Sequence, residues 1–409
     1  MRVTLIYAGI GVAGFNPDRP AGDREGSWIS HGTASIGACL KKEGHKVDLI
    51  DMRHCNGWEG VGEEIKNAES DVYMLSVSAV DYYIALYTAV LIKQHHPNSK
   101  VVVGGIHPTL FPDLYAGRNI DTVVIGEGEV SVPRLLKMEV WPKQVQGEAP
   151  DLNSIPWIDR ELFDYHKEMG CVFAPDQKTP SITMLAGRGC PYRCTYCQPA
   201  ENAVFGKPHR MRTPKNVVDE LVFLKYKYKF NSITFWDDTF TVDKRWVREF
   251  CDLYEKHNFR STIAACSRVD LVCSNEDMVK RLASIGVDWL VLGLESGSQR
   301  LLDFIKKGTT VEQNIQAAEI CRKYGIKIFG TYMYGLPTET KEESRATADM
   351  IKKISPEHAS PFFFRPIPGT DIHTYCKENK LILNDSVART GEYAPSIRGV
   401  DYDYIKSIM

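Results

Sequence analysis

Apolar positions in the first 138 residues fall into short runs separated by amphipathic stretches. Such runs predict strands covered on both faces, because a strand with one wet face would alternate instead. The stretches between them, such as 33–44 closed by Gly44 and 81–95 followed by Pro97, have helical spacing. The alternation predicts an α/β fold with a Rossmann-like, doubly wound sheet. Its five expected strands are residues 2–8, 46–51, 71–78, 100–105 and 121–128.

The alternation of strand-like and helical segments stops over residues 139–180, where prolines are frequent. This region is expected to be a linker. Alternation then resumes over 181–376, with helical stretches such as 243–257 and 311–324 between apolar runs. Six strand–helix units predict a parallel barrel, complete or a partial (β/α)6 barrel, with functional residues at the carboxyl ends of its strands. The tail, 377–409, is weakly patterned and is expected to be a C-terminal extension. The expected barrel strands are 181–187, 232–238, 261–267, 287–295, 326–333 and 358–364.

Composition narrows the class of protein. The chain of 409 residues is 43% hydrophobic and 25% charged, as globular proteins are, and its formal net charge of −2 disfavours a nucleic-acid partner. No apolar run approaches the roughly 18 residues of a membrane span. Residues 1–15 are interpreted as a first strand and a glycine-rich loop rather than a signal peptide. Eleven cysteines without a regular pairing pattern favour a reducing, cytoplasmic location.

Three cysteines in "GRGCPYRCTYC" carry the clearest chemical signal. Cys190, Cys194 and Cys197 have the spacing C-x3-C-x2-C, and clustered thiolates bind zinc or iron–sulfur clusters. A structural zinc site needs four ligands, which Cys171 or His209 could complete, so zinc stays an alternative. Three thiolates on a four-iron cluster would instead leave one iron open to a small molecule.

With an aromatic residue, Tyr196, before its last cysteine, this motif resembles the radical S-adenosylmethionine (SAM) superfamily. The segments "FWDDTF", "CSRVD", "LGLESGSQ", "GTYMYGLPTET" and "PIPGTDIH" resemble later parts of that family in the same order. Asp237 and Asp238 stand where many members have Gly-Gly-Glu, a motif missing here. The resemblance implies that the three cysteines hold a [4Fe-4S] cluster. It further implies SAM contacts from Tyr196, Asp237, Arg268, Glu295, Thr331 and Gly335.

Taken alone, these residues have simpler explanations. Glu295 after an apolar strand is about as well explained as a carboxylate at a helix N-terminus, and Arg268 as a surface ion-pair partner. The joint order of the segments favours the family.

The segments "VVVGGIHPT" and "DTVVIGEGE" resemble the cobalamin-binding domains that precede many radical SAM domains. Glycines at a strand end let a ligand approach the backbone closely, although a nucleotide-binding or purely structural Rossmann unit is the alternative. The motif D-x-H-x-x-G is missing after the first strand, where residues 8–20 read "AGIGVAGFNPDRP", so cobalamin is expected without a lower histidine ligand. The cobalamin contacts implied are Ser76, Ser78, Gly104, Gly105, His107, Gly126, Glu127 and Gly128.

The resemblance implies a class B, cobalamin-dependent radical SAM C-methyltransferase. A 5′-deoxyadenosyl radical would remove hydrogen from an unactivated sp3 carbon, and methylcobalamin would supply the methyl group. No acid–base residue is assigned. The substrate would be a small molecule, peptide or protein, and the compact form is similar to members that methylate a glutamine of methyl-coenzyme M reductase. A ferredoxin or flavodoxin would donate electrons. The alternatives are a cobalamin-binding radical SAM cyclase or rearrangement enzyme that does not methylate, and a non-enzymatic, zinc-stabilised nucleotide-binding module.

Overall fold

The computed structural model describes residues 1–10, 15, 28–206, 209–383 and 395–409. It divides into two compact units. The first contains Met1–Cys171 and the segment that begins at Ala200, and the second contains Val172–Pro199 and the chain from residue 209 onward. Most of the region expected to be a linker therefore belongs to the first unit. No helix in the described part of the chain is long and apolar enough to cross a membrane.

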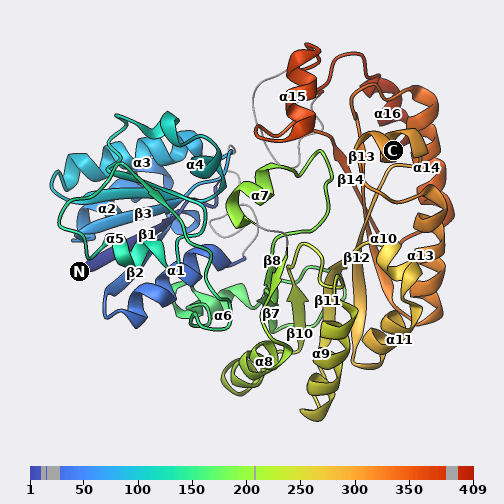
Figure 1. The fold of residues 1–409 in the computed structure, drawn as a ribbon, viewed down its shortest axis with the longest axis horizontal. Helices are drawn as coiled ribbons and strands as arrows, with labels where there is room; N and C mark the ends of the chain where they lie inside the picture. Colours follow the sequence, from blue (N-terminus) through green and yellow to red (C-terminus); the bar gives the residue numbers. More distant parts are fainter. Residues whose placement is uncertain (11–14, 16–27, 207–208, 384–394) are drawn as a thin grey trace. The chain divides into compact units, whose positions relative to one another are not determined.

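The first unit is built on a six-stranded parallel sheet with the order β2-β1-β3-β4-β5-β6 (Figure 1). This order reverses direction between β1 and β3, which is the topological switch point of a doubly wound sheet. The predicted Rossmann-like fold is therefore confirmed, with one strand more than the five expected. The strands are β1 (Arg2–Tyr7), β2 (Lys46–Asp51), β3 (Val72–Ser76), β4 (Lys100–Gly104), β5 (Thr122–Ile125) and β6 (Gln144–Gln146).

Helices cover both faces of this sheet. Tyr73 and Leu75 of β3 belong to the core beneath α2 and α3, whereas Val72 and Met74 belong to the core beneath α1 and α5. Burial on both faces explains why these strands read as continuous apolar runs. The helices are α1 (His31–Lys42), α2 (Gly57–Asn67), α3 (Tyr82–His95), α4 (Ile106–Leu110), α5 (Ser131–Leu135), α6 (Tyr165–Glu168) and α7 (Ala200–Phe205), with 3-10 turns at Met52–His54, Pro112–Tyr115 and Arg160–Leu162.

The second unit contains six parallel strands in the order β14-β13-β12-β11-β10-β7. Neighbours in this order follow one another along the chain, as right-handed strand–helix units require. The result is the predicted partial barrel. Its strands are β7 (Ser181–Met184), β10 (Ser232–Phe235), β11 (Thr262–Ser267), β12 (Val287–Glu295), β13 (Lys327–Tyr334) and β14 (His358–Phe363), and β8 (Gly187–Arg188) pairs antiparallel with β9 (Arg210–Met211).

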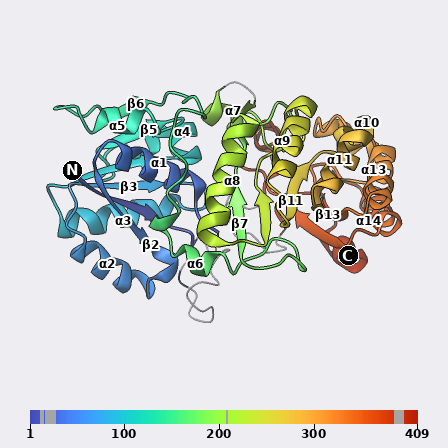
Figure 2. The same ribbon diagram turned by 90° about the horizontal axis from the view of Figure 1, so that it is seen from below.

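Both views place α8, α9, α11, α13 and α14 on the outer face of this sheet (Figures 1 and 2). Side-chain caps define several of these helices, for example the capping boxes of Thr310 with Gln313 and of Thr340 with Glu343. The helices are α8 (Pro214–Tyr228), α9 (Lys244–Lys256), α10 (Val269–Ser274), α11 (Glu276–Ser284), α12 (Gln299–Phe304), α13 (Val311–Lys323), α14 (Lys341–Ile354), α15 (Asp371–Glu378) and α16 (Tyr402–Ile408).

The C-terminal tail packs on the second unit. The hydroxyl of Tyr402, in α16, accepts hydrogen bonds from the backbone of Ser396 and Ile397. A Cβ added to Gly335, after β13, would lie 3.0 Å from the Tyr402 ring. The tail therefore covers the end of β13, although its sequence pattern is weak.

Candidate cofactor sites

The three cysteines lie on a loop that follows β8 at the carboxyl end of β7. Neighbouring elements fix its backbone: Thr195 N donates to Ile305 O, and Gln198 O accepts from Asp371 N at the start of α15. Cys194 is buried, Cys190 is partly buried and Cys197 is exposed. A loop held by backbone hydrogen bonds, with one thiol buried, one partly buried and one exposed, suits a bound group that is only partly covered by the protein.

Three cysteine thiolates are the donor set that an iron–sulfur cluster with three protein ligands requires. In the described residues, no group of three or more His, Cys, Asp and Glu side chains is arranged to hold a single metal ion. Zinc ligands must lie about 2.0–2.3 Å from one atom. Cluster thiolates bind separate irons, so they need not meet at one point. Three thiols on one loop are thus a suitable donor set for a cluster with one open iron.

A guanidinium group stands beside this donor set. Arg268, the first residue after β11, points Nη1 at Cys194 Sγ, 3.8 Å away, and lies 3.6 Å from the centre of the Tyr192 ring. Its Nη2 donates to Lys307 O and its Nε to Asp270. Burial opposes the charge, but Asp270 and Cys194 outweigh it and raise the pKa of Arg268. Positive charge is thereby fixed where three thiolates bring negative charge.

Glu295 ends β12 beside this loop, in a left-handed conformation with φ of +58°. Its Oε1 accepts from Lys307 Nζ at 2.6 Å and from the Tyr196 hydroxyl at 2.9 Å. Burial first, and then the Glu295 carboxylate, raises the pKa of Tyr196 well above its usual value, so its hydroxyl stays protonated. Within the described chain, Oε2 of Glu295 accepts no hydrogen bond and is left for a ligand.

Gly293 provides the space for this cluster. A Cβ at that position would come within 2.7 Å of Lys307 Nζ. Lys307 was missed from the sequence because it lies in the loop after α12 and no motif marks it. Tyr192 and Asp270 were also missed, although both lie inside quoted motifs, "CPYRC" and "CSRVD".

Asp237 lies just after β10 and is held by the protein backbone. Its carboxylate is 3% exposed and accepts hydrogen bonds from the backbone N–H groups of Ala186 and Gly187, which ties the end of β10 to the turn before β8. Burial raises its pKa to about 7. Both oxygens are engaged by the backbone, so a SAM contact by Asp237 stays a prediction.

The remaining two residues of the expected SAM set lie on or after β13. Thr331 is partly buried and its hydroxyl donates weakly to Leu292 O at 3.4 Å. Gly335 has φ of +82° and donates its N–H to Glu339 Oε2. Together with Arg268 and Glu295, they lie at or near the carboxyl ends of neighbouring strands, where a barrel of this kind builds its site.

In the first unit, the expected cobalamin residues gather at the carboxyl ends of β3, β4 and β5. Gly105 has φ of +99°, and a Cβ there would lie 3.0 Å from the backbone N and O of Val77 and 3.1 Å from Ser76 Oγ. Only glycine fits this position without strain. Ser76 is exposed beside it, so β3 and β4 together form a cradle without a side chain at its base.

Ser78 and His107, two further residues of the expected cobalamin site, already make hydrogen bonds within the protein, which limits the polar atoms that they can offer a ligand. Ser78 donates its hydroxyl to Asp81 Oδ2 at 2.6 Å, so it has only lone pairs left. His107 Nδ1 is 2.7 Å from the Tyr115 hydroxyl, which leaves Nε2, and burial lowers the pKa of the ring and keeps it neutral.

The glycines after β5 divide into two kinds. Gly126 has φ of +87° and donates its N–H to Thr109 Oγ1. A Cβ on Gly128 would meet Ile36 Cδ1 at 2.9 Å, so this glycine allows close packing with α1. Glu127 between them is buried. Most of the segment 8–20, which lacks the histidine motif, lies outside the described residues.

Comparisons with known proteins agree with this division. The radical SAM superfamily profile matches residues 184–351, and the B12 binding domain profile matches residues 21–136. An uncharacterized methyltransferase of Pyrococcus horikoshii is 30% identical over 370 residues, which cover 85% of this chain and 78% of the relative. The anaerobic magnesium-protoporphyrin IX monomethyl ester cyclase of Rubrivivax gelatinosus is 26% identical over 403 residues, covering 91% and 69%.

Two solved structures share the fold across the whole chain. OxsB, a cobalamin-dependent SAM radical enzyme solved with aqua-cobalamin and SAM, has a TM-score of 0.77 at 19% identity, and this chain spans 65% of its length. The radical SAM methyltransferase TsrM of Kitasatospora setae, solved with cobalamin and a [4Fe-4S] cluster, has a TM-score of 0.71 at 16% identity and is covered to 85%.

Proposed function

Because this chain belongs to the class B family of cobalamin-dependent radical SAM methyltransferases, we propose that it methylates an unactivated sp3 carbon. When bound, a reduced [4Fe-4S] cluster supplies the electron that cleaves SAM to a 5′-deoxyadenosyl radical, and methylcobalamin supplies the methyl group. The protein's contribution is to bind these groups, orient them and exclude water from them.

The second unit would bind the cluster and SAM. Cys190, Cys194 and Cys197 provide the thiolates, and Arg268 offsets their charge. Glu295 presents its free Oε2 to a hydroxyl or amino group of SAM, while Lys307 and Tyr196 fix its carboxylate through Oε1. A carboxylate fixed in this way is preorganised, because it need not reorient when the ligand arrives.

The first unit would bind cobalamin at the carboxyl edge of β3, β4 and β5. Gly104 and Gly105 admit the ligand close to the backbone, and Ser76, Ser78 and His107 supply polar atoms at the rim. Ligands of doubly wound sheets bind outside the carboxyl ends of the strands. The observation that carries the proposal is this glycine cradle in the same chain as the three-thiol loop.

For the acceptor carbon, we propose a peptide or protein side chain, with glutamine as the first candidate because of the sequence resemblance. The eleven cysteines favour a cytoplasmic location. A one-electron donor is required as a partner, since each SAM cleavage consumes one electron.

Anaerobic reconstitution with iron, sulfide, cobalamin and SAM tests the proposal. We expect 5′-deoxyadenosine together with a peptide product about 14 Da heavier, with the added CH2 derived from SAM. The cyclase relative makes a non-methylating radical reaction the second candidate, and that reaction would yield 5′-deoxyadenosine without the mass increase. Zinc without iron or cobalt would refute both.

A further inference from the structure

A cationic groove lies on the outside of the second unit, between α9 and α11. It has a volume of about 530 Å³, and we call it the α9–α11 groove. Four cationic side chains and two carboxylates are among its lining residues.

Internal ion pairs neutralise only part of this positive charge. Arg281 pairs with Asp252 and Glu255, and the lining residue Glu276 pairs with Lys323. In the described part of the chain, no carboxylate pairs with the exposed side chains of Lys244 or Arg248. Lys244 and Arg248 therefore present positive charge that no ion pair among the described residues neutralises, while the lining carboxylate of Asp277 is likewise without an ion-pair partner there.

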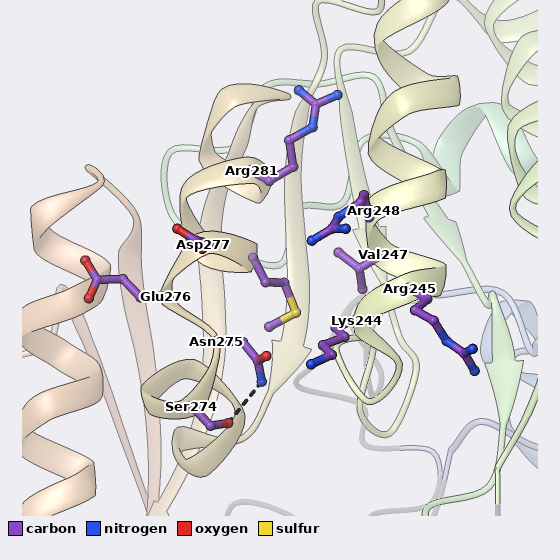
Figure 3. A pocket seen from close by; sticks show the side chains of 10 residues that line it. Lys244, Arg245, Val247, Arg248, Ser274, Asn275, Glu276, Asp277 and Arg281 are labelled. Carbon is purple, nitrogen blue, oxygen red and sulfur yellow. Dashed lines mark hydrogen bonds between the residues drawn. The ribbon is translucent and has the colours of Figure 1, made fainter.

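The two unpaired cations point into the groove. Lys244 and Arg248 extend from α9 toward α11, whereas Arg245, on the same helix, points away (Figure 3). Val247 and Met278 also line the groove, but they are buried, with exposed fractions of 1% and 8%, and so contribute little accessible apolar surface. Exposed charged side chains of this kind are suited to steering an oppositely charged partner into a short-lived complex.

The groove is joined to the three-thiol loop by one short helix. Arg268, which contacts Cys194 Sγ, is the N-cap of α10, and Ser274, the last residue of α10, lines the groove. Six residues of α helix are about 9 Å long. The end of α10 that lines the groove is thus one short helix away from Arg268, whose side chain contacts the loop.

We propose that the α9–α11 groove is the docking surface for an acidic one-electron carrier protein of the flavodoxin or ferredoxin type. The inference rests on the proposed function, which needs one electron for each SAM cleaved. The carrier loses one electron, the group held by the three-thiol loop gains it, and no atom is transferred. Opposite charge speeds such encounters and makes them sensitive to salt.

The test compares the full chain with the variant K244S/R248S, and uses K352S/K353S on α14 as a control with the same change of charge. Binding of fluorescently labelled flavodoxin is measured by anisotropy at low and high salt, and SAM cleavage is driven either by the reduced carrier or by dithionite. We expect K244S/R248S to bind flavodoxin about tenfold more weakly at low salt, with a smaller difference at high salt. Its carrier-driven cleavage should fall similarly, while its dithionite-driven cleavage and the control variant stay at the wild-type level.

Equal flavodoxin binding by all three proteins would overturn the inference, as would equal losses in both variants. Weaker binding of a single-stranded RNA by K244S/R248S, with carrier binding unchanged, would overturn it in favour of a nucleic-acid surface. Failure of the wild-type protein to cleave SAM with dithionite would count against the proposed function. The anisotropy measurements would still show whether the carrier binds at the α9–α11 groove.

Discussion

The buried pair of Lys307 and Glu295 allows a quantitative test of the site. Their side chains are 7% and 9% exposed and 2.6 Å apart. Replacing Lys307 with Met leaves the carboxylate buried without a cation, which costs about 3–5 kcal/mol. For a unit of roughly 150–250 residues, each kcal/mol lowers Tm by about 2–4 °C. We therefore expect K307M to lower the Tm of the second unit by roughly 6–20 °C.

The assay is thermal unfolding of the cofactor-free protein, so that SAM and the cluster do not contribute. E295Q should be destabilised to a similar extent, because Lys307 is then the unpaired buried charge. The double variant K307M/E295Q should regain most of the loss, since a neutral pair needs no compensation. As a control, K323M breaks the exposed pair with Glu276 and should cost less than about 1 kcal/mol. Single variants within about 2 °C of wild type, or a double variant as unstable as the sum of the singles, would refute the reasoning.

Three other predictions follow from the same geometry. C190A/C194A/C197A should lose about four irons per chain by metal analysis and keep its cobalt, because the thiolates alone hold the cluster. Asp237 has a folded pKa of about 7, above its unfolded value, so the fold prefers its neutral form and loses stability as pH rises from about 4 to 7. D237N should flatten that loss in pH-dependent unfolding. G105A should cost about 1–3 kcal/mol at its strained backbone and reduce the cobalamin retained after gel filtration.

The cysteine and glycine variants each have a matched control. C251A/C376A removes buried thiols outside the loop and should keep its iron. G62A lies in α2, where a Cβ meets nothing within 4 Å, and should keep its cobalamin. Iron retained in the triple cysteine variant, an unchanged pH profile in D237N, or equal cobalamin in both glycine variants would contradict the corresponding prediction.

Much of the fold could be predicted because a strand that is buried on both faces appears in the sequence as a continuous apolar run. β2 and β12 match their expected ranges to the residue, and most other strands differ by a few residues at their ends. β6 was missed because Gln144–Gln146 is a polar strand at the sheet edge, where no apolar run is needed.

The candidate site was less visible. A motif can be recognised only where several functional residues lie close together in the sequence, as they do around Cys194 and Glu295. Lys307 stands in a loop whose return toward Glu295 depends on tertiary contacts, including the hydrogen bond from Arg268 to its carbonyl oxygen. The sequence also did not show that Asp237 accepts backbone hydrogen bonds. An aspartate after a strand looks the same in the sequence whether it binds the backbone or a ligand. The partners of Asp237 in these bonds, Ala186 and Gly187, are 50 or more residues away.

Helix α7 has a consequence for any attempt to dissect this protein. It begins three residues after Cys197 and belongs to the first unit, where it packs against α4. The cobalamin-binding half is therefore encoded in two separate stretches of the gene, and the second lies inside the coding sequence of the other half. A fragment ending at residue 171 would lack one of its own helices. Exchanging halves between relatives would accordingly require three joints rather than one, with α7 transferred together with α4, against which it packs.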